Sequence, residues 1–175
     1  MKKFTYLAVL ILISHSTLLS CASNASDSEK TSTNSEIEIN EQVIKGISAA
    51  SLYEPLKQKG FTIDKQIGAD AIFVNCSKES RESAENLRIA GSSPEKIQEI
   101  RASYTSYTSS NINDLAKPFL GFIYTLPYED STPEKAKEWL EKNISKNSKI
   151  TINGVDFEIF ANSKNIRTLL ITPKK

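Results

Sequence analysis

Histidine and cysteine are scarce in this sequence, which contains one histidine and two cysteines among 175 residues. Two thiols cannot build a disulfide-rich scaffold, and they cannot supply a tetrahedral zinc site of the multi-cysteine kind. Positive charge is not in excess either, because 22 lysines and arginines face 21 aspartates and glutamates. A net charge of +1 excludes a strongly basic nucleic-acid-binding protein, so we expect no nucleic-acid partner.

Glycine-rich binding motifs are also missing from the sequence. None of the patterns GxGxxG, GxxxxGK[ST] and GxSxG occurs, so phosphate-binding loops and the hydrolase nucleophile elbow lack support. Six glycines and six prolines exclude a collagen. Apolar residues make up 39% and charged residues 25%, which is typical of an ordinary globular protein. We therefore expect a globular domain that holds no cofactor and no metal.

An apolar stretch lies near the amino terminus. Lys2 and Lys3 precede a run of mainly apolar residues from Phe4 to Leu19, which a few polar residues interrupt. Positive charge followed by a short apolar run is the pattern of a secretory signal peptide. A membrane-spanning helix needs about 20 apolar residues, and this run is shorter and more polar. We therefore interpret residues 1–20 as a signal peptide.

The apolar stretch ends in the sequence LLSC at residues 18–21. It resembles the lipobox of bacterial lipoprotein precursors, in which an aliphatic residue, a tolerant position and a small residue precede an obligatory cysteine. The resemblance covers residues 1–21 and implies a diacylglycerol thioether on Cys21, cleavage before it, and an acyl chain such as palmitate on the freed amine. Two or three acyl chains anchor a protein firmly, at about 0.8 kcal/mol per buried methylene. Ala22, where aspartate would imply the inner membrane, favours the outer membrane of a cell with two membranes.

Cleavage before Cys21 would remove His15, the one histidine of the sequence. A chain without histidine cannot form a Ser-His-Asp or Cys-His catalytic site. The alternative is an ordinary cleaved signal peptide with an accidental cysteine.

In the lipoprotein interpretation, residues 21–35 comprise the lipidated cysteine and a stretch rich in Ser, Thr and Asn. This stretch has no large aliphatic side chain to bury, so we expect a flexible tether.

Residues 36–175 have the size of a single domain, and their patterning predicts an α+β fold. We expect an antiparallel sheet of about five or six strands with helices packed on one face, and a C-terminal three-stranded meander. The expected strands are residues 61–64, 69–76, 119–126, 150–152, 155–161 and 166–172. The expected helices lie within residues 41–59 and behind the related motifs SSPEK (92–96) and STPEK (131–135), where a hydroxyl cap precedes proline.

Glu129 and Asp130 are the candidate catalytic carboxylates, in a loop between an expected strand and an expected helix. Two acids there could bind a hard cation or act on a glycosidic bond. In the alternative interpretation, Asp130 and Glu134 complement the helix N-terminus and Glu129 is solvated. Cys76 lies in a strand-like apolar run, so we expect a buried, inert thiol, with a reactive or intermolecular thiol as the alternative. We assign no catalytic residue.

Three tyrosines, Tyr104, Tyr107 and Tyr128, are the candidate residues for binding a partner. The first two lie in a segment rich in Ser and Thr, and the third flanks the acidic loop. Tyrosine suits contact with sugars or protein surfaces because it offers a large area at low entropic cost. The alternative is that Tyr104 and Tyr107 continue the buried face of an expected helix.

Together these features favour a lipid-anchored protein of the bacterial cell envelope, facing the periplasm or the cell surface, that binds a partner without catalysis. The partner would be another envelope protein, an enzyme to be inhibited, or cell-wall glycan, in addition to the membrane reached through Cys21. The alternative is a carboxylate-dependent hydrolase that acts on an envelope polymer.

Overall fold

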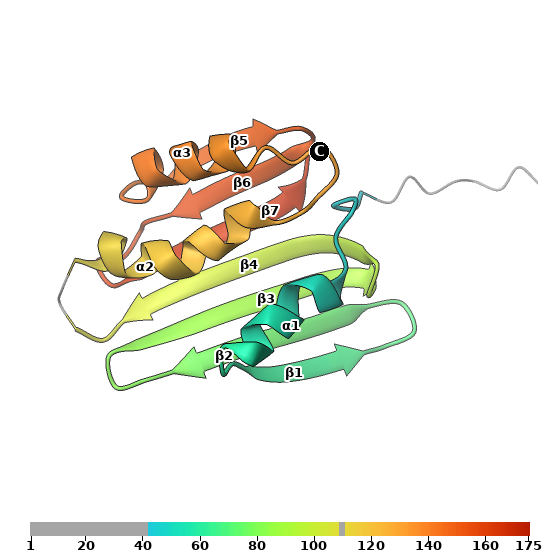
Figure 1. Ribbon diagram of the computed structural model, residues 1–175, viewed down its shortest axis with the longest axis horizontal. Helices are drawn as coiled ribbons and strands as arrows, with labels where there is room; N and C mark the ends of the chain where they lie inside the picture. The colour runs from blue at the N-terminus through green and yellow to red at the C-terminus, as the bar shows by residue number, and fades with distance from the viewer. Residues whose placement is uncertain (1–41, 109–110) are drawn as a thin grey trace, which may run out of the picture. The chain divides into compact units, whose positions relative to one another are not determined.

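A seven-stranded antiparallel sheet dominates the residues that the computed structural model describes, 42–108 and 111–175 (Figure 1). The predicted signal peptide, Cys21 and the tether lie outside these residues. The strand order across the sheet is β1-β2-β3-β4-β7-β6-β5. The strands are β1 (Thr62–Ile67), β2 (Ile72–Glu79), β3 (Ser83–Ser93), β4 (Lys96–Ser106), β5 (Ser148–Ile152), β6 (Val155–Phe160) and β7 (Ile166–Pro173).

The helices of the described residues all lie on one face of this sheet, in front of it in Figure 1. They are α1 (Ala49–Gln58), α2 (Ile112–Leu120), the short 3₁₀-helix η1 (Gly121–Thr125) and α3 (Pro133–Asn143). This arrangement confirms the α+β class, and β5, β6 and β7 confirm the C-terminal meander. The opposite face of the sheet carries no helix of the described residues.

The core lies between the sheet and the helices. In β2 every second residue is buried, so Ile72, Val74 and Cys76 face the helices. The Cys76 thiol is buried as expected, and burial raises its pKa from 9.0 to about 11, an effect that Lys65 partly opposes. Because the thiolate is the reactive form of cysteine, burial and the raised pKa both disfavour a reactive thiol at this position.

The prediction of a helix after SSPEK is wrong. The motif spans the turn between β3 and β4, and the residues that follow it belong to β4. Pro94 and Glu95 occupy the turn, and Ser93 pairs with Lys96 across it. Proline's fixed φ suits the second position of a β-turn as well as the first turn of a helix, so the local signal is ambiguous. Gly91 opposite the turn has no room for a side chain, since a Cβ there would lie 2.1 Å from the Lys96 carbonyl oxygen.

The strand expected at residues 119–126 is also wrong, because these residues end α2 and form η1. The buried residues of α2 are Ile112, Ala116, Phe119 and Leu120, which is the spacing of one helical face. A short apolar run does not by itself distinguish a strand from a buried helical segment. The sheet nevertheless exceeds the expected five or six strands, because β3 and β4 were not predicted as strands.

Two chain reversals have the local sequence that their backbone requires. Asn153 and Gly154 connect β5 to β6, with φ angles of 48° and 79°, as a two-residue hairpin turn of this composition requires. Gly60 follows α1 with a φ of 83°, the left-handed conformation in which a helix commonly ends. The helix expected after STPEK is confirmed as α3, with proline at its start.

Candidate functional site

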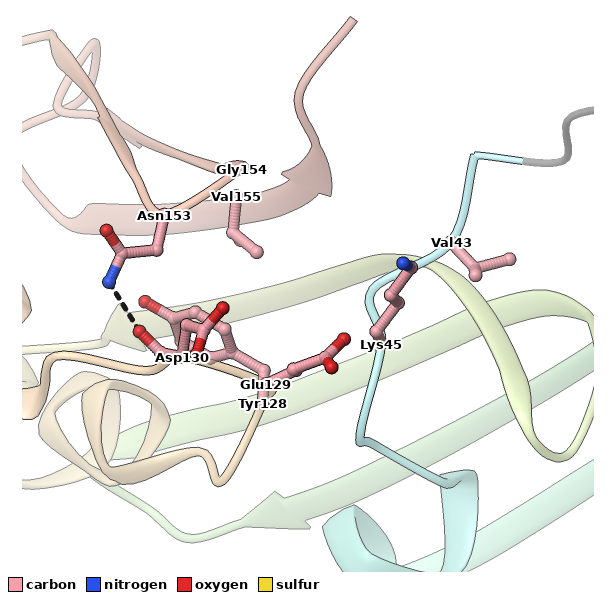
Figure 2. A pocket seen from close by; sticks show the side chains of 8 residues that line it. All are labelled: Val43, Lys45, Tyr128, Glu129, Asp130, Asn153, Gly154 and Val155. Carbon is pink, nitrogen blue, oxygen red and sulfur yellow. Dashed lines mark hydrogen bonds between the residues drawn. The ribbon is translucent and has the colours of Figure 1, made fainter.

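The acidic loop predicted from the sequence borders a cavity of about 250 Å³ (Figure 2). Three segments distant in the sequence form it: the chain before α1, the loop before α3, and the hairpin turn between β5 and β6. The lining residues are Val43, Lys45, Tyr128, Glu129, Asp130, Asn153, Gly154 and Val155. Glu129 and Asp130 are both exposed, and they share this cavity.

Backbone contacts hold the chain before α1 against the acidic loop. The Glu129 amide donates a hydrogen bond of 2.9 Å to the carbonyl oxygen of Lys45. Gly46 has a φ of 82°, and a Cβ on this residue would lie 2.8 Å from the Glu129 nitrogen. Glycine therefore permits both the left-handed backbone and the close approach that together place Lys45 beside Glu129.

The hairpin turn is tied to the start of α3 through one side chain. The side-chain amide of Asn153 donates to the carbonyl oxygen of Asp130 and, over 2.8 Å, to the hydroxyl of Thr132. Thr132 makes no capping hydrogen bond with its side chain, so the expected hydroxyl cap is absent and its oxygen accepts from Asn153 instead. Asp130 and Asn153 both have positive φ, 58° and 48°. Asparagine and aspartate adopt this left-handed backbone more readily than other residues with a side chain.

The cavity brings charges of both signs together without pairing them. In Figure 2 the Glu129 carboxylate points toward the side of the cavity that Lys45 forms. Within residues 42–108 and 111–175, no ion pair connects Lys45 to Glu129 or to Asp130. In the same ranges no group of three or more His, Cys, Asp or Glu side chains could hold a metal ion. The two predicted carboxylates thus meet a lysine rather than a third acid.

The three candidate tyrosines are not brought together. Tyr104 lies in β4 with its ring buried among the core residues. Tyr128 is only 4% exposed, and its ring centroid lies 6.0 Å from that of Phe157. Tyr107 is 52% exposed, and its hydroxyl donates a hydrogen bond of 2.9 Å to Glu79, which raises the pKa of Tyr107. Tyr104 and Tyr128 are core residues, so Tyr107 is the member of the set whose ring can reach a partner.

The Tyr128 hydroxyl is buried beneath the acidic loop. No hydrogen bond of normal geometry reaches it from the described residues. Burial raises the pKa of Tyr128, and the nearby backbone of Thr132 opposes this shift. The hydroxyl of a cavity-lining residue therefore lies buried beside the Thr132 backbone without a hydrogen bond of good geometry.

A second surface, which the sequence did not predict, lies on the helix-free face of the sheet. We call Phe73, Arg88 and Arg101 the arginine cluster. Arg88 of β3 lies directly opposite Arg101 of β4 in the register, and both are exposed. The Arg88 guanidinium carbon lies 5.1 Å from the Phe73 ring centroid, and Arg101 Nε lies 3.3 Å from Glu99 Oε1.

Two members of the arginine cluster, Phe73 and Arg88, line a shallow groove of about 690 Å³ on the same face of the sheet. Its apolar member, Phe73, is 36% exposed. Polar and apolar residues alternate in residues 86–90 and 99–103, and this pattern could have predicted two strands with the arginines on one face. Sequence reasoning missed it because β4 was interpreted as a helix, which left β3 without a partner.

Comparison with known proteins gives no indication of function, so the residues of the cavity and of the arginine cluster are the basis for inferring it. No protein-family model, no curated protein and no solved structure matches the chain. In the part of the chain that the structure describes, no helix has the length and apolar character required to cross a bilayer.

Proposed function

We propose that this protein is a lipid-anchored protein of the bacterial cell envelope that binds a partner protein through the helix-free face of its sheet. The lysines, the apolar run and the LLSC sequence at residues 18–21 support the anchor. The arginine cluster supports the binding surface. The partner that fits this surface presents a carboxylate beside an apolar side chain.

The observation that carries the proposal is the pairing of Arg88 with Arg101 across neighbouring strands. Like charges directly opposite each other destabilise a sheet. The presence of two arginines at these positions therefore does not serve the stability of the β3–β4 pair. In the described residues Arg88 has no ion pair, and its guanidinium lies over Phe73. A guanidinium binds a carboxylate through two parallel hydrogen bonds, which a lysine cannot do.

The composition of the surface also suits a protein partner. Arginine and aromatic side chains are enriched among the residues that contribute most to the affinity of protein interfaces. The adjacent groove adds an open concave area on the same face. A partner carboxylate between Arg88 and Arg101 would neutralise the like-charge contact, and Phe73 would provide the apolar contact.

Photo-crosslinking in intact cells tests this proposal. A benzophenone amino acid replaces Phe73 on the helix-free face, and in a matched control it replaces Leu115, which is 40% exposed on α2. We expect a discrete protein adduct from position 73 and not from position 115. Adding Arg101→Glu to the first variant should remove the adduct, because it reverses the charge that a partner carboxylate would meet.

Two results would reject the proposal. Equal adducts from positions 73 and 115 would show that the helix-free face is not the contact surface. An adduct at position 73 that a muramidase converts to small fragments would identify cell-wall glycan, rather than a protein, as the partner. Thermal unfolding of each variant, measured on purified protein, establishes that the altered chain is folded.

A further inference from the structure

The cavity beside α3 contains three charged side chains that have no partner in the described residues. Lys45 contributes one ammonium, and Glu129 and Asp130 contribute two carboxylates. The sum of these charges is −1. A ligand that neutralises each of them carries two positive groups and one negative group.

We propose that this cavity binds a small diamino carboxylic acid, of which L-lysine is the simplest common example. Its two ammonium groups meet the carboxylates of Glu129 and Asp130, and its carboxylate meets the ammonium of Lys45. The cavity of about 250 Å³ lies below the range of drug-sized pockets, about 300–1,000 Å³, and suits a single amino acid.

The side chains of the site stand on a backbone that is already held in place. The hydrogen bond from the Glu129 amide to the Lys45 carbonyl fixes the two sides of the cavity relative to each other. The amide of Asn153 binds the Asp130 carbonyl and so holds the carboxylate-bearing loop against the hairpin turn. A ligand that binds a preorganised site avoids the entropic cost of ordering it.

The Tyr128 hydroxyl is a second observation that supports a ligand at this site. Tyr128 lines the cavity, is only 4% exposed, and its hydroxyl makes no hydrogen bond of normal geometry with the described residues. Buried hydroxyls in proteins are generally hydrogen-bonded, so an unused one beside a charged cavity requires an explanation. A bound ammonium or carboxylate that shifts the loop slightly would provide its partner.

A divalent cation fits this cavity less well than a diamino acid. Calcium takes six to eight oxygen ligands, and magnesium demands near-octahedral geometry. The described residues around the cavity offer two carboxylates, and the ammonium of Lys45 would repel a cation. The presence of both charge signs favours an organic ligand with both charge signs.

Titration of the ¹⁵N-labelled full-length protein in detergent micelles tests the proposal. L-lysine is compared with cadaverine, which lacks the carboxylate, and with L-norleucine, which lacks the side-chain ammonium. We expect L-lysine to give saturable shifts of the Glu129, Asp130 and Asn153 amides. The other two probes should bind about tenfold more weakly, because each loses one charge-assisted contact.

Variants separate a lysine site from a general cation site. Lys45→Met should weaken L-lysine about tenfold and should not weaken cadaverine, because the variant loses the carboxylate contact together with a charge that repels cations. Glu129→Gln should weaken both ligands by a similar factor. Glu54→Gln, which alters an exposed acid on α1 outside the cavity lining, is the matched control and should change neither affinity.

Three results would overturn the proposal. The first is the absence of shifts at the cavity with L-lysine up to about 10 mM. The second is equal binding of cadaverine or norleucine, which would show that the charges do not select the ligand. The third is an equal loss of L-lysine and cadaverine binding in Lys45→Met. None of these results bears on the arginine cluster, which lies on the helix-free face and is tested separately.

Discussion

Arg88 of β3 and Arg101 of β4 lie directly opposite each other on the helix-free face, and Phe73 lies beside Arg88. Two charges of the same sign in this position work against the strand pair that carries them. Arg88 is compensated by the ring of Phe73 and Arg101 by Glu99, so the pair persists in a folded sheet. Residues that a fold tolerates rather than needs are candidates for function.

Replacement of Arg88 should therefore have little effect on stability. Arg88→Thr removes a cation–π contact worth about 0.5–1 kcal/mol and relieves a repulsion of about 0.2–1 kcal/mol. We expect the free energy of unfolding in urea to change by less than about 1 kcal/mol. A loss above about 2 kcal/mol would show that Arg88 is a structural residue and would weaken the assignment of this face to binding.

The approach of the chain before α1 to the acidic loop depends on Gly46. Gly46→Ala should lower the free energy of unfolding by about 2–4 kcal/mol, because a left-handed backbone and a Cβ clash with the Glu129 nitrogen coincide. Gly60→Ala is the control, since Gly60 has a φ of 83° and a Cβ added to it would meet no atom within 4 Å. It should cost only about 1 kcal/mol for the backbone. Equal losses in urea unfolding would contradict the importance of the close contact.

Asp156 should make stability depend on pH in the acidic range. Burial pushes the pKa of Asp156 up, but Lys149, at 2.8 Å, and the Thr151 hydroxyl, at 2.6 Å, outweigh burial and hold this pKa below its usual value. A depressed folded-state pKa contributes stability above the pKa of the unfolded chain, and this contribution is lost as pH falls through the folded pKa. Asp156→Asn should therefore be less stable than the wild type by about 1–3 kcal/mol at pH 7.

Below the folded-state pKa of Asp156 the two proteins should converge, because the wild-type carboxyl is then neutral as well. Urea unfolding at pH 7 and at a series of falling acidic pH values measures this convergence. Glu134→Gln, an exposed acid at the start of α3, provides a comparison with little effect at either pH. A constant difference between Asp156→Asn and the wild type at all pH values would contradict the assigned cause.

Lipidation of Cys21 has its own test, separate from the folded domain. In a bacterial host, Cys21→Ser should accumulate as an uncleaved precursor that incorporates no alkyne-labelled fatty acid. The wild type should incorporate the label and lose residues 1–20, as measured by intact mass. Cys76→Ser is the control for the second thiol and should be labelled like the wild type. Normal labelling of Cys21→Ser would refute the anchor.

Local sequence determined the elements whose signals are complete within a few residues. Asn153-Gly154 defines a hairpin turn because both residues tolerate positive φ. The strands β5, β6 and β7 follow from alternation around short turns, and their meander connects neighbours in sequence. The sequence therefore predicted the α+β class and its C-terminal part.

The paired motifs SSPEK and STPEK show where local information ends. The first became the turn between β3 and β4, and the second became the start of α3. Serine or threonine before proline and glutamate favours both outcomes, so the residues after each motif decide between them. After the first motif, Ile100, Ala102 and Tyr104 alternate along a sheet and bury their side chains against the helices, and this burial outweighs the local helix signal.

The two candidate sites were decided by tertiary structure. The sequence alone predicted that Glu129 and Asp130 share a loop. Nothing in the sequence around these two acids indicated that Lys45 lies beside them. The pairing of Arg88 with Arg101 exists only in the register of β3 with β4, and the cavity exists only where three distant segments meet. Composition and spacing determine which groups a chain carries and where it turns. Proximity between distant residues follows from burial of the common core, and no local pattern contains it.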